Sequence, residues 1–284
     1  MRDAIVKYGL FYGALLVVGA IAWKLTMLAT DGSGGHGTSL LLSTTPALSA
    51  LVGVVAVVIA GATGLLAGRL VGVSGGLLDM GVVLAWGAFG FGSLRQIVMA
   101  NANAQTGEGT RSALTMLAAE AVVVGGLVVA AAWLIERMAR RDDAEPVDEK
   151  GAVACLTMFA SGAAGSLLGV WLLAQSGYKG QVIGAAMAGG IIGGIIGYAL
   201  DHRARLWPLL AGCLAVSVAG PVIALVNGGG DATLHASIVA GTVVRWAQLT
   251  GLDGAAGACI GLPVGLYIAK GLLGHAGRVA EDAA

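Results

Sequence analysis

The sequence is poor in charged and aromatic residues and contains little proline or cysteine. Only 11% of its 284 residues are Asp, Glu, Lys or Arg, whereas soluble domains carry about 25%. This shortage excludes a water-soluble globule, and three cysteines are too few for a disulfide scaffold. Because sixteen Lys and Arg are balanced by sixteen Asp and Glu, the chain has no basic field that would attract nucleic acid.

Apolar residues and glycine fill the remainder of the chain. Hydrophobic residues account for 57% of it, and glycine supplies 48 positions. A transmembrane helix needs about 20 mainly apolar residues. The sequence therefore predicts an all-α, polytopic transmembrane helix bundle of about eight spans in the lipid bilayer, with runs too long and unalternating for barrel strands. The predicted spans are 8–28, 46–70, 75–92, 113–135, 152–174, 181–200, 206–227 and 254–273.

Lysines and arginines near the span ends predict the orientation, since cytoplasmic loops carry an excess of them. Arg2 and Lys7 precede the first span, and the link 137–150 holds three arginines and a lysine, whereas loop 29–45 holds neither residue type. Both termini are therefore predicted to be cytoplasmic, and the Ala- and Gly-rich, Lys-poor composition indicates a bacterial inner membrane. Three residues in the predicted external loops go against the rule, namely Arg95, Arg111 and Lys179.

Residues 233–250 fit neither a span nor an ordinary loop. They are moderately apolar but contain His235, Arg245 and Gln248. A ninth span here would place the C-terminus outside the cell. The lysine at position 270 would then lie on the external side, against the rule that cytoplasmic segments carry the excess of Lys and Arg. We therefore predict an interfacial or re-entrant segment on the external side, where protein or water covers its polar groups.

The two halves of the chain follow a similar plan, which predicts an internal 4+4 duplication. Residues 1–136 give three spans, an external polar segment and a fourth span; residues 151–284 repeat that order after the cytoplasmic linker 137–150. Since each half has an even number of spans, the copies would be parallel and related by an axis along the membrane normal. The alternative is a chance similarity between two sets of glycine-rich spans.

Glycines recur at offsets of 0, 3 and 7, which places them on one face of a helix. Such faces allow the close helix packing that membrane proteins use, and the alternative is that they line a narrow path. Mid-span Pro221 and Pro263 predict kinks in the last two spans. The glycine sets are Gly61, Gly64 and Gly68; Gly162, Gly165 and Gly169; Gly190, Gly193 and Gly197; and Gly254, Gly257 and Gly261.

A few charges fall inside the predicted spans, where an ionisable group is costly and marks a site of function. Glu120 is the deepest by position and would suit a proton-coupled carboxylate. Lys24 lies at a similar depth, so the two side chains can pair if their helices touch; the alternative for Lys24 is snorkelling to the interface. For Glu120 the alternative is a hydrogen bond to a neighbouring helix.

Four further charges lie near span ends and complete the candidate ion or substrate path. Arg69 and Asp79 flank a short hairpin, so we expect a pair that acts as a structural clamp or as an ion gate. Arg245 and Asp253 flank the segment 233–250 and would contribute to a charged external vestibule, or else be solvated loop charges.

Nothing in the sequence indicates a metal or a cofactor. The four histidines map to loops or span ends, where they cannot supply axial haem ligands in a bundle core. The three cysteines fall in separate spans without metal-ligand spacing, and the phosphate-binding glycine motif of ATPases is missing. We therefore identify no catalytic residue and leave enzymatic activity undecided.

Two functions remain open from the sequence. The repeated plan, the glycine faces and Glu120 favour a secondary transporter or channel for a small solute or ion, proton-coupled through Glu120. The alternative is a non-transporting structural or assembly subunit, which packs against other membrane subunits or forms a homo-oligomer.

Overall fold

The protein is an all-helical bundle with eight helices long and apolar enough to span a membrane, which confirms the predicted class. The computed structural model describes residues 2–30, 35, 38–139, 151–201 and 205–282, with side chains described between residues 4 and 273 of these ranges. Parts of the predicted linker (140–150) and of the basic turn after the sixth span (202–204) lie outside these residues.

The first span combines α1 (Arg2–Gly13), the π-helical η1 (Ala14–Val18) and α2 (Gly19–Thr26). The remaining spans are α3 (Pro46–Val71), α4 (Val73–Phe89), α6 (Thr110–Ala139), α7 (Gly151–Leu173), α8 (Lys179–Leu200), α9 (Leu206–Asn227) and α11 (Gly251–Asp282).

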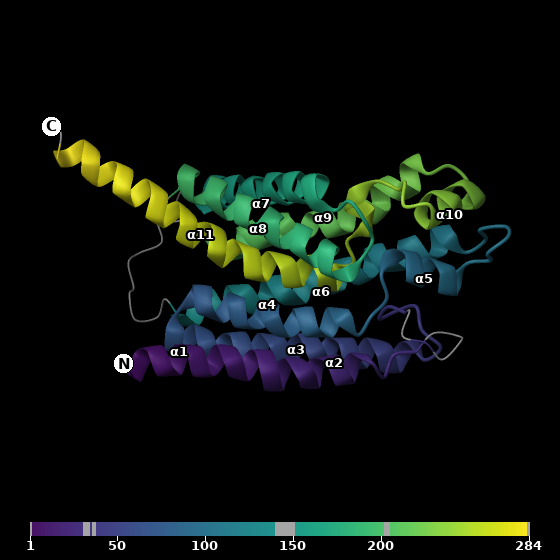
Figure 1. The fold of residues 1–284 in the computed structure, drawn as a ribbon, viewed down its shortest axis with the longest axis horizontal. Coiled ribbons are helices and arrows are strands. Elements are labelled where there is room, and N and C mark those ends of the chain that lie inside the picture. The colour runs from purple at the N-terminus through teal and green to yellow at the C-terminus, as the bar shows by residue number, and fades with distance from the viewer. Residues whose placement is uncertain (1, 31–34, 36–37, 140–150, 202–204, 283–284) are drawn as a thin grey trace.

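Three short helices lie at one end of the bundle, which we call the distal end. They are α5 (Leu94–Asn101), α10 (Asp231–Val239) and the 3-10 helix η2 (Arg245–Gln248). The first span begins and α11 ends at the opposite end (Figure 1). The predicted interfacial segment 233–250 thus forms two short helices, and neither is long enough to cross a membrane.

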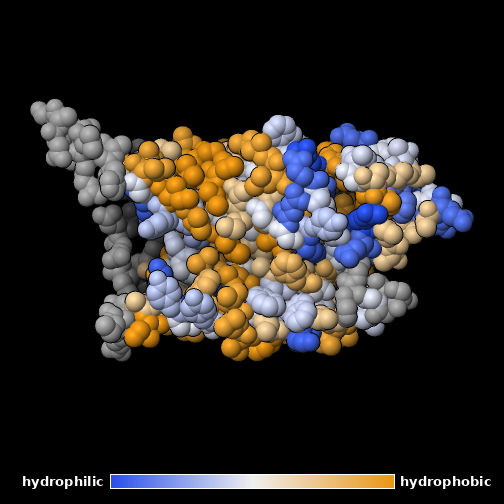
Figure 2. Space-filling view, viewed as in Figure 1, coloured by the Kyte–Doolittle hydropathy of each residue, from blue (hydrophilic) through white to orange (hydrophobic). Residues whose placement is uncertain are grey.

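The N-terminal four spans pack against the C-terminal four through four helices, namely α4, α6, α9 and α11. α11 packs along both α4 and α8, and α6 packs along α9 (Figure 1). Apolar side chains cover the middle of the bundle, whereas hydrophilic ones gather towards the distal end (Figure 2). This distribution suits a bundle whose middle lies in hydrocarbon and whose distal end lies in water.

The distal end has an apolar core of its own. Leu94 and Ile97 of α5 and Leu114 of α6 pack there with Leu234 and Ile238 of α10. Two polar links fasten α10 to the start of α6: the Gly109 amide donates to Asp231 Oδ2 at 3.1 Å, and Thr110 Oγ1 lies 3.3 Å from His235 Nδ1. The short helices therefore form a fixed cap rather than loose loops.

Glycines bring the C-terminal four spans into backbone contact. A Cβ at Gly165 would lie 2.2 Å from the Gly193 nitrogen, and one at Gly261 would lie 2.0 Å from the Met187 carbonyl oxygen. Real Cβ atoms do not approach other atoms this closely, so α7, α8 and α11 could not adopt their spacing with alanine at these positions. Neighbours of the other predicted glycines here are Leu209 for Gly162 and Gly197, Gly189 for Gly169, Leu262 for Gly190, Ser217 for Gly254 and Ile183 for Gly257.

The glycine face of α3 is used more unevenly. A Cβ at Gly64 would lie 2.8 Å from the Gly76 carbonyl oxygen of α4, and one at Gly68 would lie 2.8 Å from Ile135 of α6. At Gly61 the nearest atom would be the Ala131 Cβ at 3.4 Å, an ordinary contact. Helix α9 continues past Pro221, and helix α11 continues past Pro263. The kinks at these prolines stay a prediction.

Candidate functional site

Two of the arginines near the distal end bind helix carboxyl termini. Arg111 donates to the carbonyl oxygens of Leu225 at 3.1 Å and Gly229 at 2.8 Å, at the end of α9. Arg245 donates to the Trp171 carbonyl near the end of α7. The last carbonyls of a helix lack partners within the helix and carry partial negative charge, so these arginines stabilise α9 and α7. Arg245 is thus held by α7 rather than free in a vestibule.

The candidate Asp253 forms a buried ion pair that the sequence did not reveal. Both of its carboxylate oxygens accept hydrogen bonds from Lys179 Nζ, at 2.9 and 3.0 Å. Asp253 also accepts from Thr250 Oγ1 at 2.7 Å, and its side chain is 1% exposed against 12% for Lys179. The pair joins the first turn of α8 to the first turn of α11 and neutralises the charge of Lys179.

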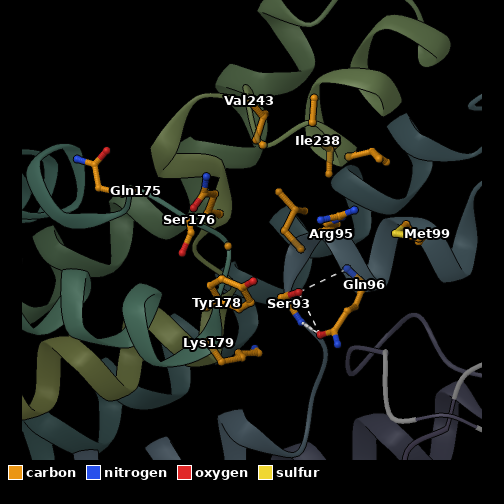
Figure 3. Close-up of a pocket in the computed structure, with 16 residues that line it drawn as sticks. Ser93, Arg95, Gln96, Met99, Gln175, Ser176, Tyr178, Lys179, Ile238 and Val243 are labelled. Carbon is orange, nitrogen blue, oxygen red and sulfur yellow. Dashed lines mark hydrogen bonds between the residues drawn. The ribbon is translucent and has the colours of Figure 1, made fainter.

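Arg95 is the third of the cations that contradicted the loop-charge rule, and its guanidinium has no hydrogen-bond or ionic partner among the described residues. It lines a cavity of about 770 Å³ at the distal end. Residues of α5 form one wall, the turn between α7 and α8 forms another, and the α10 to η2 segment completes it (Figure 3). Because these segments come from both halves of the chain, the cavity requires the complete fold.

Most polar groups around this cavity already have partners within the protein. Ser93 and Gln96 form a capping box at the start of α5, shown by the dashed lines in Figure 3. Ser176 donates to Gln181, and Gln175 Nε2 donates to the Leu172 carbonyl at 2.8 Å.

Besides Arg95, Gln248 is an exception: this lining residue is 5% exposed, and its Oε1 has no hydrogen-bond partner in the described structure. Buried polar atoms are normally paired, so this unpaired oxygen is a candidate contact for a ligand or water.

Glu120 holds a loop rather than a lysine. It is 3% exposed, and its Oε2 accepts a hydrogen bond from the Leu40 amide at 2.9 Å. The Leu41 amide and the Ser39 hydroxyl face the same carboxylate. The Leu40 side chain packs against Gly53, so the loop between the first two spans enters the bundle at this point.

The predicted Glu120–Lys24 pair is therefore absent. Lys24 Nζ instead lies 4.9 Å from the centroid of the neighbouring Trp23 ring. The backbone amides reach Glu120 because residues 38–41 turn back into the bundle. No residue pattern in the loop predicted this turn.

Replacing Glu120 with alanine is expected to release this loop. The Leu40 amide would be left buried without an acceptor, at a cost of about 1 to 3 kcal/mol. Hydrogen–deuterium exchange of the peptide containing Leu40 and Leu41 should accelerate, more in Glu120→Ala than in Glu120→Gln, which keeps a carbonyl acceptor. Glu108→Ala, at an exposed carboxylate of the distal end, is the control; equal exchange in all three variants would contradict the role given to Glu120.

The expected pair between Arg69 and Asp79 does not form. Arg69 is exposed, whereas Asp79 is 4% exposed and has no hydrogen-bond or ionic partner among the residues described. Gly64 and Gly68 of α3 both lie against Gly76 of α4. Arg69, one position further along, is therefore turned away from α4 by the helical repeat.

Two structural features were missed from the sequence. Glu136, near the end of α6, is 5% exposed, and its Oε2 accepts from the Leu206 amide at 3.1 Å, so it caps the start of α9. The cavity was missed because it combines α5 with segments about 80 and 145 residues later in the chain. The signals that pointed to it were Arg95 and Lys179, two cations in predicted external loops that line the cavity.

Within the described ranges, no three His, Cys, Asp or Glu side chains gather into a metal-binding group. Comparisons with protein-family models, with curated proteins and with solved structures give no match for this chain.

Proposed function

We propose that this integral membrane protein is a secondary transporter or channel for a small solute, and that the distal cavity is the entrance to its path. The observation that supports this most directly is the cavity itself, of a size that suits small molecules and formed by segments from both halves. Arg95 and Gln248 line it with polar groups that the fold does not use.

A parallel duplication supports the same proposal. The packing of α4 on α11 corresponds to that of α6 on α9 when the two sets of four spans are exchanged. In each set the second span also packs on the fourth, as α3 on α6 and α8 on α11. Transporters with parallel repeats move one half against the other around a site between them. One difference is that α3 packs extensively on α4, whereas α8 makes little contact with α9.

Glu120 is not part of this proposal as a proton carrier. Its hydrogen bond to Leu40 supports a structural role, and it does not line the distal cavity. Asp79 is the better candidate for an ionisable group on the path, because it is buried in a span without a partner among the described residues and such groups mark ion or solute pathways.

Blocking the cavity is expected to stop solute flux. Ala240→Cys places a thiol in the lining directly after α10, and Ala236→Cys places one within α10 at an exposed position that does not line the cavity. Both variants, in a Cys155→Ala background, are labelled with a bulky membrane-impermeant maleimide and reconstituted in proteoliposomes. Stopped-flow light scattering then measures the entry of potassium chloride, sodium lactate, alanine and glycerol.

The proposal requires flux above that of protein-free liposomes for at least one solute. Labelling at position 240 should reduce this flux several-fold, whereas labelling at position 236 should leave it unchanged. Flux that is unaffected by either label would remove the cavity from the path. If none of the four solutes enters faster than into protein-free liposomes, the alternative function, that of a non-transporting structural subunit, is favoured.

The second candidate is a non-transporting structural subunit. It is supported by the carboxylates at Glu120, Glu136 and Asp253, which all accept hydrogen bonds that hold the fold together. Under this alternative the distal cap would be a docking face for another membrane chain.

A further inference from the structure

The net charge that the distal cavity offers to a ligand depends on which of its charged side chains are already paired. Two cations, Arg95 and Lys179, line the cavity, and no lining residue is acidic. Lys179 is neutralised by Asp253, which lies behind it and is almost fully buried. One positive charge, that of Arg95, therefore remains for a ligand. A guanidinium binds carboxylate and phosphate groups in a two-pronged geometry.

Gln248 adds a second polar requirement. Its Oε1 is buried and has no partner in the described part of the chain, and an amide oxygen accepts hydrogen bonds but cannot donate them. A ligand that satisfies it must carry an O–H or N–H group. Gln248 belongs to η2 and Arg95 to α5, so the two polar positions lie on different walls of the cavity.

The rest of the lining is mainly apolar. Leu94 and Met99 of α5 face the cavity together with Ile238, Val239 and Val243 of the α10 segment. In Figure 3 Arg95 lies between Tyr178 on one side and Met99 on the other, with Ile238 and Val243 along the upper wall. An apolar body next to the acid group would be removed from water by these side chains.

We propose that the distal cavity binds an amphipathic organic acid. Its acid group contacts Arg95, its apolar body lies along Leu94, Ile238 and Val243, and a neighbouring hydroxyl or amine donates to Gln248. This inference rests on the proposed function for its setting, since the ligand would be the solute that enters the path. The same acid-plus-apolar chemistry is found in soluble acids and in anionic lipids.

The test measures binding with four probes that share a six-carbon body. Hexanoate carries the acid, 2-hydroxyhexanoate adds a hydroxyl, and hexanamide and hexylammonium replace the negative charge. The intact protein is placed in nanodiscs of phosphatidylcholine, and saturation-transfer NMR titrations give each Kd, with empty nanodiscs as the blank. Hexanoate should bind at least about tenfold more tightly than hexanamide or hexylammonium, because only the acid pairs with Arg95.

Variants assign each contact. Arg95→Gln should weaken hexanoate binding about tenfold and leave hexanamide unchanged, whereas Arg69→Gln, an exposed arginine at the other end of the bundle, should change neither. 2-Hydroxyhexanoate should bind about threefold more tightly than hexanoate, and Gln248→Leu should abolish that difference. Equal binding of acid, amide and amine, or acid binding that survives Arg95→Gln, would overturn the proposal.

A further pair of samples distinguishes the two sources of the acid. Hexanoate binding that persists when phosphatidylglycerol is added to the nanodiscs supports a soluble acid as ligand. Binding that is lost with phosphatidylglycerol supports the head group of an anionic lipid as the occupant. Acid binding without any flux would refute transport and keep this inference, whereas flux of glycerol or potassium without acid binding would do the reverse.

Discussion

Gly261→Ala is expected to destabilise the packing of α11 on α8 strongly. The added Cβ would lie 2.0 Å from the Met187 carbonyl oxygen and 3.0 Å from the Ile191 nitrogen, both backbone atoms of α8. Neither neighbour can rotate away, so α8 and α11 would have to separate. Overpacking of a rigid contact costs about 1 to 3 kcal/mol, and loss of the neighbouring close approaches adds to it.

Gly184→Ala is the matched control for this change. Gly184 lies in α8, the partner helix of Gly261, and a Cβ there would meet nothing within 4 Å. Alanine is the better helix former by about 1 kcal/mol, so this variant should be neutral or slightly stabilising. Unfolding by SDS titration in dodecyl maltoside measures both. A Gly261→Ala protein as stable as the control would mean that α8 and α11 are not in backbone contact.

Breaking the buried ion pair is the second change with a large expected effect. Lys179→Met leaves the Asp253 carboxylate, 1% exposed, without its cation. An uncompensated buried charge costs about 3 to 5 kcal/mol. Asp253→Asn should cost less, because Lys179 lines the distal cavity and its ammonium can be hydrated there.

A double-mutant cycle checks that the two effects arise from one interaction. The Lys179→Met/Asp253→Asn protein has no charge left at this site, so it should recover part of the stability lost in Lys179→Met. Additive losses in the double variant would show that the two side chains do not interact. Arg137→Met, at an exposed arginine whose guanidinium lies over the Trp133 ring, should stay within about 0.5 kcal/mol of the parent protein.

The spans could be predicted because each depends on a local property of the sequence. Apolar length alone identified all eight, and the lysine at position 270 argued against a ninth span at 233–250. The spacing at Gly165 and Gly261 marked surfaces that lie in close contact. These features need no knowledge of which helix is the partner.

The partners of the charged residues could not be predicted because they depend on distant segments. Glu120 meets a loop amide about 80 residues earlier in the chain, and Lys179 meets a carboxylate 74 residues later. Pairing Glu120 with Lys24 assumed that equal depth in the membrane means contact, which holds only when helix order is known. The depth of a charge was predictable, whereas its neighbour was not.

The shared distal core has a consequence for the order in which the chain is made. Leu94 and Leu114 emerge from the ribosome long before Leu234 and Ile238, the residues that cover them. Until α10 has been synthesised, the apolar side of α5 lacks the part of its cover that Leu234 and Ile238 provide. Synthesis beyond about residue 240 therefore closes this surface, and a nascent chain of four spans presents it to whatever insertase or chaperone attends the membrane at that stage.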